Sequence, residues 1–256
     1  IYPLDRVMRL LLVFLKEPIP GKVKTRLAQD VGDEDASRYY KALVEVLLKQ
    51  LQGLQDCRIR FCYAPDDAED AIRFWVLPEM RATSSSTEGL YLAPHSLTVS
   101  EPTQEVDFRP QGSGDLGDRL DSAFKVAFED NYSEVAVIGT DCPDCGARWI
   151  NAAFSRLSSD KGHDVVIGPS SDGGYYLLAL KSPASKLFLN IPWSENDVFE
   201  KTAEAAMSAG LTLESLPKLS DVDHLSDWDR VIASPLGAAL KKALGEPLED
   251  TLSDLS

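Results

Sequence analysis

Three segments of this sequence carry charged side chains in patterns suited to binding a phosphorylated ligand. The first is FLKEPIPGKVKTRL, residues 14–27, in which Lys22, Lys24 and Arg26 alternate just after a proline–glycine turn. Backbone amides of such a turn can point at an anion, and a helical turn starting near Thr25 would present its N-terminus to phosphate. A solvated basic loop explains the same pattern, because short Lys/Arg runs are usually exposed. The spacing is not that of a Walker P-loop.

Carboxylates follow at two later positions. The apolar run SEVAVIGTD, residues 133–141, ends at Asp141, where an oxygen ligand would suit a phosphate-bound Mg²⁺. In SDVDH, Asp221 and Asp223 alternate along an extended segment, and Asp223 would complete a two-carboxylate site with Asp141. Capping of the following helix is the competing explanation for both Asp141 and Asp223. We expect the basic turn to lie opposite these carboxylates, with room for a diphosphate between them.

Two further motifs have simple structural explanations. SSDGGYY places Asp172 and Gly173 between two apolar runs, which predicts a β-hairpin turn, although Asp172 is also a functional candidate. Cys142 and Cys145 form a C-x-x-C, but no thioredoxin-sized unit surrounds it, and a zinc site would need two more ligands. We therefore expect reduced thiols at both positions.

Composition narrows the possible partners. The chain has 256 residues, a formal net charge of −15, 44% hydrophobic residues and 26% charged residues. This acidity argues against a nucleic-acid binder, whereas a small anionic ligand remains compatible with a local basic pocket. Because we find neither an apolar run long enough to span a bilayer nor a signal-peptide pattern, we expect a cytoplasmic protein without a membrane partner.

Apolar periodicity predicts the elements that position these motifs. Strands are expected at residues 9–15, 58–64, 133–141, 164–169, 175–180 and 211–216. Helices are expected at residues 34–55, 66–75, 114–130, 146–159, 194–210 and from about 226. Their alternation indicates an α/β fold with a parallel sheet covered on both faces. We interpret residues 82–105 as a surface insertion, residues 1–234 as one domain and residues 235–256 as a helical or flexible tail.

Six motifs in a fixed order give the chain a family resemblance from about residue 9 to residue 230. They are KEPIPGKVKTRL, QGSGDLGDRL, GTDCPD, GPSSDGGYYLLAL, IPWS and DVDHLSDW. Together they resemble a bacterial family of predicted glycosyltransferases associated with radical-SAM and selenoprotein-like domains or with arsenosugar biosynthesis. The resemblance implies a GT-A-like fold: a three-layer α/β/α sandwich with a mostly parallel central sheet and a small antiparallel hairpin. Two features depart from the family pattern: residues 82–105 are longer, and His224-Leu225 replaces Thr-Pro.

The resemblance also implies roles for individual residues. A nucleotide-binding role falls on Lys16, Gly21, Lys24, Thr25, Arg26, Gln111, Gly114 and Asp115. Metal binding falls on Asp141 and Asp223, a catalytic role on Asp172, and contact with the substrate on Gly173 and Trp193. The implied enzyme is a transferase that requires Mg²⁺ or Mn²⁺ and uses a nucleotide-diphospho-sugar donor with a small-molecule acceptor. The alternatives are a nucleotidyltransferase that releases pyrophosphate and a catalytically silent nucleotide-binding module.

Overall fold

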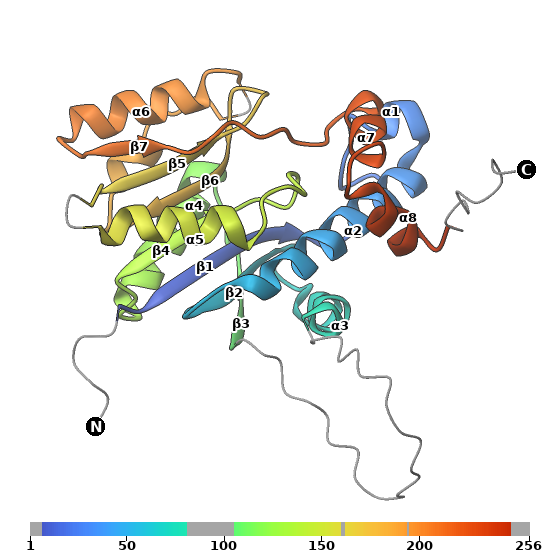
Figure 1. The fold of residues 1–256 in the computed structure, drawn as a ribbon, viewed down its shortest axis with the longest axis horizontal. Coiled ribbons are helices and arrows are strands. Elements are labelled where there is room, and N and C mark those ends of the chain that lie inside the picture. The colour runs from blue at the N-terminus through green and yellow to red at the C-terminus, as the bar shows by residue number, and fades with distance from the viewer. Residues whose placement is uncertain (1–6, 81–104, 160–161, 194, 247–256) are drawn as a thin grey trace, which may run out of the picture.

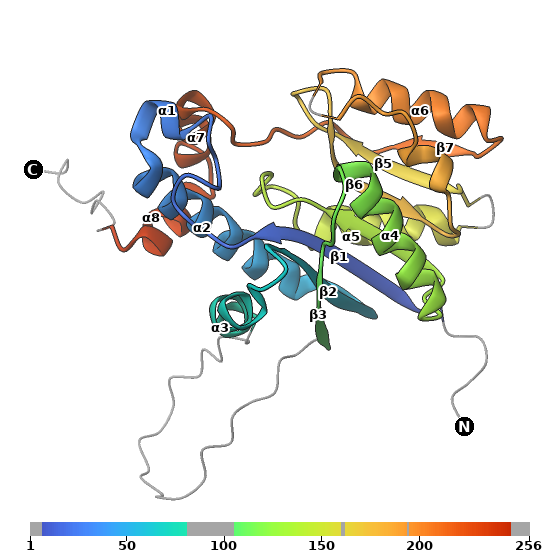
Figure 2. The same ribbon diagram turned by 180° about the vertical axis from the view of Figure 1, so that it is seen from behind.

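One sheet with helices on both faces organises the chain (Figures 1 and 2). The computed structural model describes residues 7–80, 105–159, 162–193 and 195–246. The strands are β1 (Arg9–Lys16), β2 (Cys57–Ala64), β3 (Val106–Pro110), β4 (Glu134–Ile138), β5 (Val165–Pro169), β6 (Tyr175–Leu180) and β7 (Leu213–Ser215). The helices are α1 (Ala28–Val31), α2 (Asp33–Gln50), α3 (Glu69–Glu79), α4 (Leu116–Glu129), α5 (Ala147–Ser158), α6 (Val198–Ser208), α7 (Leu225–Ile232) and α8 (Gly237–Leu244). Short 3-10 turns lie at η1 (Leu51–Gly53) and η2 (Ser185–Phe188).

The strand order is β3-β2-β1-β4-β6-β5-β7. Strand β1 pairs in parallel with β2 on one side and with β4 on the other, so the direction of strand addition reverses beside β1. Strand β6 runs antiparallel to both β4 and β5. The predicted fold class, a mostly parallel sheet with one antiparallel hairpin, is therefore confirmed.

Strand β1 is apolar along most of its length because both of its faces are covered. On one face, Leu11, Val13 and Leu15 pack into the same apolar cluster as residues of α2, α3 and α5. On the other, Leu10 and Leu12 pack with residues of α4 and α6. Figure 1 shows α2 and α5 in front of the sheet, and Figure 2 brings α4 to the front.

Helix α2 is buried on two sides, which explains its broad apolar surface. Its inner side packs against the sheet, and its outer side contributes Leu43 and Val46 to a cluster with residues of α7 and α8. The rings of Tyr39 and Trp228 stack with centroids 4.1 Å apart. Helices α7 and α8 are therefore anchored on α2, beyond the edge of the sheet.

The sequence patterns missed one strand and misplaced two helix starts. Strand β3 was not predicted; it follows the expected insertion at 82–105, most of which lies outside the described residues. The helix expected from Ser194 begins at Val198, and Ser194 itself is not described. The helix expected from residue 66 begins at Glu69. The helical turn expected near Thr25 is present as a turn at residues 25–27, closed by a hydrogen bond from the amide of Ala28 to the carbonyl of Lys24, and α1 follows from Ala28. Within the described part of the chain, no helix has the length and hydrophobicity needed to cross a bilayer.

Candidate functional site

A cavity of about 760 Å³ opens at the carboxyl ends of β1 and β4, where the strand order reverses. This is where ligands usually bind in open α/β sheets, and the volume is typical of a ligand site. Of the residues predicted to form the site, the cavity is lined by Lys16, Lys24, Thr25, Arg26, Gln111, Asp141, Asp172, Trp193 and Asp223. Topology thus brings most of the predicted residues into one cavity.

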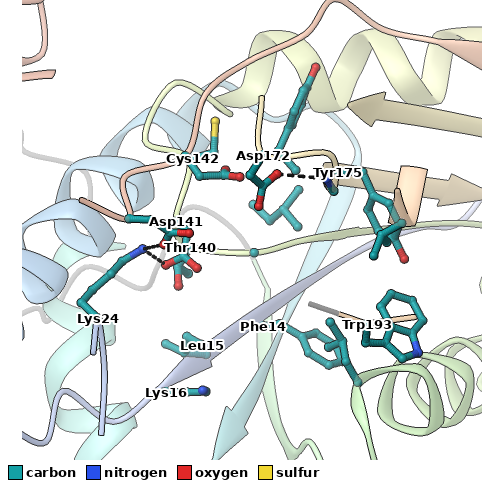
Figure 3. Close-up of a pocket in the computed structure, with 18 of the residues that line it drawn as sticks. Phe14, Leu15, Lys16, Lys24, Thr140, Asp141, Cys142, Asp172, Tyr175 and Trp193 are labelled. Carbon is teal, nitrogen blue, oxygen red and sulfur yellow. Dashed lines mark hydrogen bonds and ion pairs between the residues drawn. The ribbon is translucent and has the colours of Figure 1, made fainter. Parts of the chain in front are cut away.

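Lys24 lies between the two carboxylates predicted to bind metal (Figure 3 shows its contact with Asp141). Its Nζ is 2.6 Å from Oδ1 of Asp141 and 3.2 Å from Oδ1 of Asp223. Nη1 of Arg26 lies 3.1 Å from the other oxygen of Asp223. We expected the basic turn to lie opposite the carboxylates across a gap, but the structure pairs them directly.

The Lys24 side chain is only 3% exposed, whereas that of Asp141 is 52% exposed. Burial alone would lower the pKa of Lys24, but the charges of Asp141 and Asp223 outweigh burial and leave it raised. The ammonium is therefore held charged between the carboxylates. The backbone of Lys24 has φ +47°, a left-handed conformation that residues other than glycine rarely adopt outside constrained sites.

Backbone pairing fixes Asp141 and Asp223 relative to each other. The amide of Val222, between Asp221 and Asp223, donates to the carbonyl of Asp141 over 2.9 Å. Neither predicted carboxylate caps a helix: the N-cap of α5 is Gly146, and that of α7 is His224. At the start of α7 it is Asp227 whose carboxylate accepts from the backbone amides of residues 223 and 224. The competing capping explanation for both predicted ligands is therefore wrong.

A second carboxylate pair, Asp172 and Asp221, lines the same cavity. The hydroxyl of Ser170 donates to Asp221 over 2.5 Å and also contacts Asp172. Burial raises the pKa of Asp221 to about 7; the hydrogen bond from Ser170 opposes this shift, and the charges of Asp172 and Asp141 add to it. Asp172 also accepts from the amide of Gly174, the expected role of an aspartate in a tight turn.

Tyr40 joins the ends of the two strands that flank the cavity. Its hydroxyl accepts from the backbone amide of Lys16 over 2.9 Å and lies 3.1 Å from Oγ1 of Thr140. The ring is 3% exposed, and burial raises the pKa of Tyr40, so the hydroxyl stays protonated. The helical periodicity of α2 predicted only that Tyr40 is buried; nothing in the sequence signalled this contact.

Gln111 braces the strand ends from the opposite side. Its side-chain amide donates to the carbonyls of Leu15 and Cys62 over 3.0 and 2.9 Å. Both amide hydrogens are therefore used by the backbone, which leaves Oε1 as the group that faces other partners. Nη1 of Arg119 approaches that oxygen at 3.5 Å.

An aromatic corner, defined by Phe14, Tyr175 and Trp193, forms the other end of the cavity (Figure 3). The rings of Tyr175 and Trp193 meet edge to face, with centroids 6.4 Å apart. Among the described residues, the buried hydroxyl of Tyr175 has no hydrogen-bond partner. A Cβ added at Gly117 of α4 would lie 2.5 Å from Nε1 of Trp193, so the indole is seated directly against that helix.

Four predicted residues do not line the cavity as the structure describes it: Gly21, Gly114, Asp115 and Gly173. Asp115 caps α4, where it forms a capping box with Asp118. Gly173 has φ +92°, and a Cβ there would meet the carbonyl oxygen of Asn196 at 1.8 Å. These contacts give Asp115 and Gly173 structural roles beside the cavity, independent of any ligand.

The donor set suits a divalent cation that is bound together with phosphate. Mg²⁺ commonly takes one or two carboxylates and fills its other positions with phosphate oxygens and water. Asp141 and Asp223 provide such a pair, already bridged by a cationic group. The described residues contain no cluster of three or more His, Cys, Asp or Glu side chains arranged to hold a metal ion by themselves. The carboxylates therefore fit a cation that arrives with its own oxygen ligands.

The two cysteines beside the site are free, as predicted, and both are buried. Cys142 and Cys145 are both free, with 2% and 0% of their surface exposed. Burial raises the pKa of both thiols, and the charge of Asp221 adds to this effect. Neither thiol is therefore poised to react as a thiolate.

Comparison with known proteins places the chain in a family. Residues 47–195 match a family described as "Uncharacterized protein conserved in bacteria (DUF2064)". The chain belongs to the DUF2064 family. A comparison with curated proteins finds no match.

Solved structures share this fold. A protein from Desulfovibrio desulfuricans G20, named a "putative nucleotide-diphospho-sugar transferase", is 30% identical with a TM-score of 0.73, over 93% of this chain and 97% of that one. A 4-diphosphocytidyl-2C-methyl-D-erythritol synthase from Anaerococcus prevotii is 9% identical with a TM-score of 0.51, over 87% and 95%. A cytidylyltransferase from Leptospira borgpetersenii is 11% identical with a TM-score of 0.50, over 88% and 85%. The last two similarities concern the fold alone.

Proposed function

We propose that this DUF2064 protein is a transferase that requires Mg²⁺ or Mn²⁺ and uses a nucleotide-diphospho-sugar donor with a small-molecule acceptor. The observation that carries the proposal is the convergence of Lys24, Arg26, Asp141 and Asp223 in one cavity at the switch point of the sheet. Cationic side chains beside a carboxylate pair are the combination that a metal-bound diphosphate requires. The similarity to the D. desulfuricans protein supports the same assignment.

The phosphates would lie at the charged end of the cavity. Lys24 and Arg26 would bind their oxygens, and Lys16 and Thr25 line the same wall. When bound by Asp141 and Asp223, a divalent cation would stabilise the negative charge that develops on the leaving nucleoside diphosphate. Gln111 would act mainly by holding the strand ends in place, since its amide hydrogens are already used.

The transferred group and its acceptor would lie between the carboxylates and the aromatic corner. Trp193 offers an apolar ring surface, and the unpartnered hydroxyl of Tyr175 lies beside it. Asp172 lies between this corner and the phosphate end (Figure 3), a position suited to contact with a sugar hydroxyl or to accepting a proton from the acceptor. We propose that Gly21, Gly114, Asp115 and Gly173 act on the ligand indirectly, by setting the loops that carry these side chains.

A nucleotidyltransferase is the second candidate, because the two cytidylyl-type enzymes share this fold and a metal–phosphate site would serve either reaction. Product analysis separates the two. Incubation with nucleotide sugars should release a nucleoside diphosphate if the first proposal is right. Release of pyrophosphate from a nucleoside triphosphate would instead establish the second.

Nucleotide binding itself is tested by Asp141→Asn. A thermal-shift screen of nucleotides and nucleotide sugars, with and without Mg²⁺, should identify a ligand whose stabilising effect depends on the metal. Asp141→Asn should lose that dependence. Asp144→Asn removes an exposed carboxylate three residues away and should keep it. Equal metal dependence in both variants would refute the assignment of Asp141. Metal-dependent binding without turnover of any donor would favour the catalytically silent module.

Three broader assignments stay predictions. We propose that residues 1–234 form a single transferase domain followed by a C-terminal tail at 235–256, whose helix α8 packs on α2. The cytoplasmic location is inferred from sequence patterns, because the sequence has neither a membrane-spanning apolar run nor a signal-peptide pattern. The association with radical-SAM or arsenosugar chemistry rests on the sequence resemblance, and identifying the acceptor would test it.

A further inference from the structure

Lys24 occupies the space between the two carboxylates that we propose as metal ligands. Its ammonium contacts Oδ1 of both Asp141 and Asp223, and Arg26 holds the remaining oxygen of Asp223. With 3% of its side chain exposed, Lys24 is screened from water far more than either carboxylate. The ion pairs are therefore a built feature of the site and differ from the exposed pairs common on protein surfaces.

A divalent cation cannot share this position with the ammonium. Mg²⁺ binds oxygens at about 2.0–2.1 Å, so a cation on Asp141 and Asp223 would lie against Lys24 Nζ with like charges almost in contact. To admit a bare ion, Lys24 would have to give up both partners and leave a buried charge without compensation, which is strongly unfavourable. The lysine therefore competes directly with free metal for the two carboxylates.

A diphosphate would change this competition between Lys24 and the cation. It brings oxygen ligands for the cation and, at the same time, a new anionic partner for Nζ. Lys24 can then turn from the carboxylates to a phosphate oxygen without losing ionic contact, and Arg26, which is 55% exposed, can do the same. The exchange conserves the pairing of every charge.

We propose that Lys24 excludes a bare divalent cation from Asp141 and Asp223 and gives way to a cation that arrives with a diphosphate. This inference rests on the proposed function and adds to it a reason why metal and nucleotide bind together. The coupling is reciprocal: each ligand must strengthen the binding of the other by the same factor. Lys24 is thus a specificity-determining residue that selects the metal–diphosphate complex.

Direct metal binding tests the inference without any enzymatic turnover. Mn²⁺ alone is titrated into the protein, and free Mn²⁺ is measured by electron paramagnetic resonance. Lys24→Met keeps an unbranched side chain as far as Cε and removes the ammonium. It should bind Mn²⁺ at least about tenfold more tightly than the wild type, within the usual range of coupling between sites. Lys22→Met, an exposed lysine of the same turn, should behave as the wild type. Adding Asp141→Asn to Lys24→Met should abolish the gain, which places the ion on the carboxylate pair.

The second arm uses the preformed complex of Mn²⁺ with inorganic pyrophosphate, titrated by calorimetry. Here the order should reverse, because the wild type has a lysine to offer the phosphate and Lys24→Met does not. This crossing of affinities distinguishes the inference from a purely structural role, in which both ligands would bind more weakly to a damaged site. If Lys24→Met does not fold, Lys24→Gln replaces it, and Lys24→Arg, which keeps the charge, should still exclude bare Mn²⁺.

Equal Mn²⁺ affinity of the wild type and Lys24→Met would overturn the inference. So would tight binding of Mn²⁺ alone to the wild type. If Lys24→Met gains Mn²⁺ binding but no variant binds the pyrophosphate complex or any nucleotide, exclusion of the bare ion stands and the proposed function fails. The two conclusions are therefore separated by the same set of titrations.

Discussion

The hydroxyl of Tyr40 should contribute measurably to the stability of this fold. It accepts from the amide at the end of β1 and lies in hydrogen-bonding contact with Thr140, which follows β4. Tyr40→Phe removes this oxygen and leaves the ring packing unchanged. The amide of Lys16 and the hydroxyl of Thr140, itself 4% exposed, then lose a partner at a site with little water to replace it.

The expected loss follows from the number of contacts removed. Two hydrogen bonds at about 1 kcal/mol each lower the free energy of unfolding by about 2 kcal/mol. For a chain of this size, that corresponds to a fall in melting temperature of about 4–8 °C. Urea or thermal unfolding followed by circular dichroism measures both quantities. Affinity for a metal–nucleotide complex should fall as well, because the same hydroxyl positions the two strand ends that carry Lys16 and Asp141.

Tyr39→Phe is the matched control. Tyr39 is the preceding residue of α2, and its ring stacks on Trp228 at the outer side of the helix, away from the cavity. This substitution keeps the stacking and should change stability by about 0.5 kcal/mol or less. If Tyr40→Phe unfolds at the same denaturant concentration as Tyr39→Phe, Tyr40 does not join the strand ends and the reasoning is wrong.

Two further predictions concern regions on either side of the site. Thr212 donates its amide and hydroxyl to Asp164, and these bonds, with Lys181, lower the pKa of Asp164 from its usual 3.8 to about 2. Because the pKa of Asp164 is depressed, its carboxylate stabilises the fold above about pH 4, and this contribution is lost between about pH 4 and pH 2. Thr212→Val should therefore lower the free energy of unfolding by about 1 kcal/mol at pH 7 and by less as the pH approaches 2. Acid-unfolding curves measure this difference. In α4, Gly117→Ala should lower stability by about 1–3 kcal/mol and shift the tryptophan fluorescence, because the added methyl would meet both Trp193 and the carbonyl of Phe188. Gly139→Ala, which has open space, should leave stability unchanged, and equal stability of the two variants would contradict the packing argument.

Much of the fold could be predicted because local sequence patterns indicate most of its strands and helices. Buried strands such as β1 are continuous apolar runs, and Asp-Gly between two such runs predicted the β5–β6 hairpin. Strand β3 escaped prediction because only Phe108 of its five residues is buried. Its pairing with β2 is reinforced by Arg60, which forms ion pairs with Asp107 and Asp130. These residues are far apart in the sequence, so no local pattern predicts the contacts.

The composition of the site was predictable, but its pairings were not. The proximity of Asp141 and Asp223 could be predicted because both follow strands whose carboxyl ends meet at one edge of the sheet. Tyr40 and Ser170 could not, since each looked like an ordinary helix or loop residue and acts through a contact made only in the folded chain. Lys24 was predicted to face a phosphate, and the structure shows it facing carboxylates.

That last difference changes the explanation of how an acidic protein would hold a diphosphate. The cavity is not a positively charged pocket in an otherwise acidic protein, because Lys24 and Arg26 are already paired with carboxylates. Among the described residues that line it, the cations are Lys16, Lys24 and Arg26, and the carboxylates are Asp141, Asp172, Glu195, Asp221 and Asp223. Carboxylates outnumber cations, so a diphosphate alone would enter a cavity that is already negative and would be repelled. In the proposed function, a divalent cation accompanying the diphosphate would offset this excess. The charge on the cavity wall therefore predicts that nucleotide binding would depend on metal.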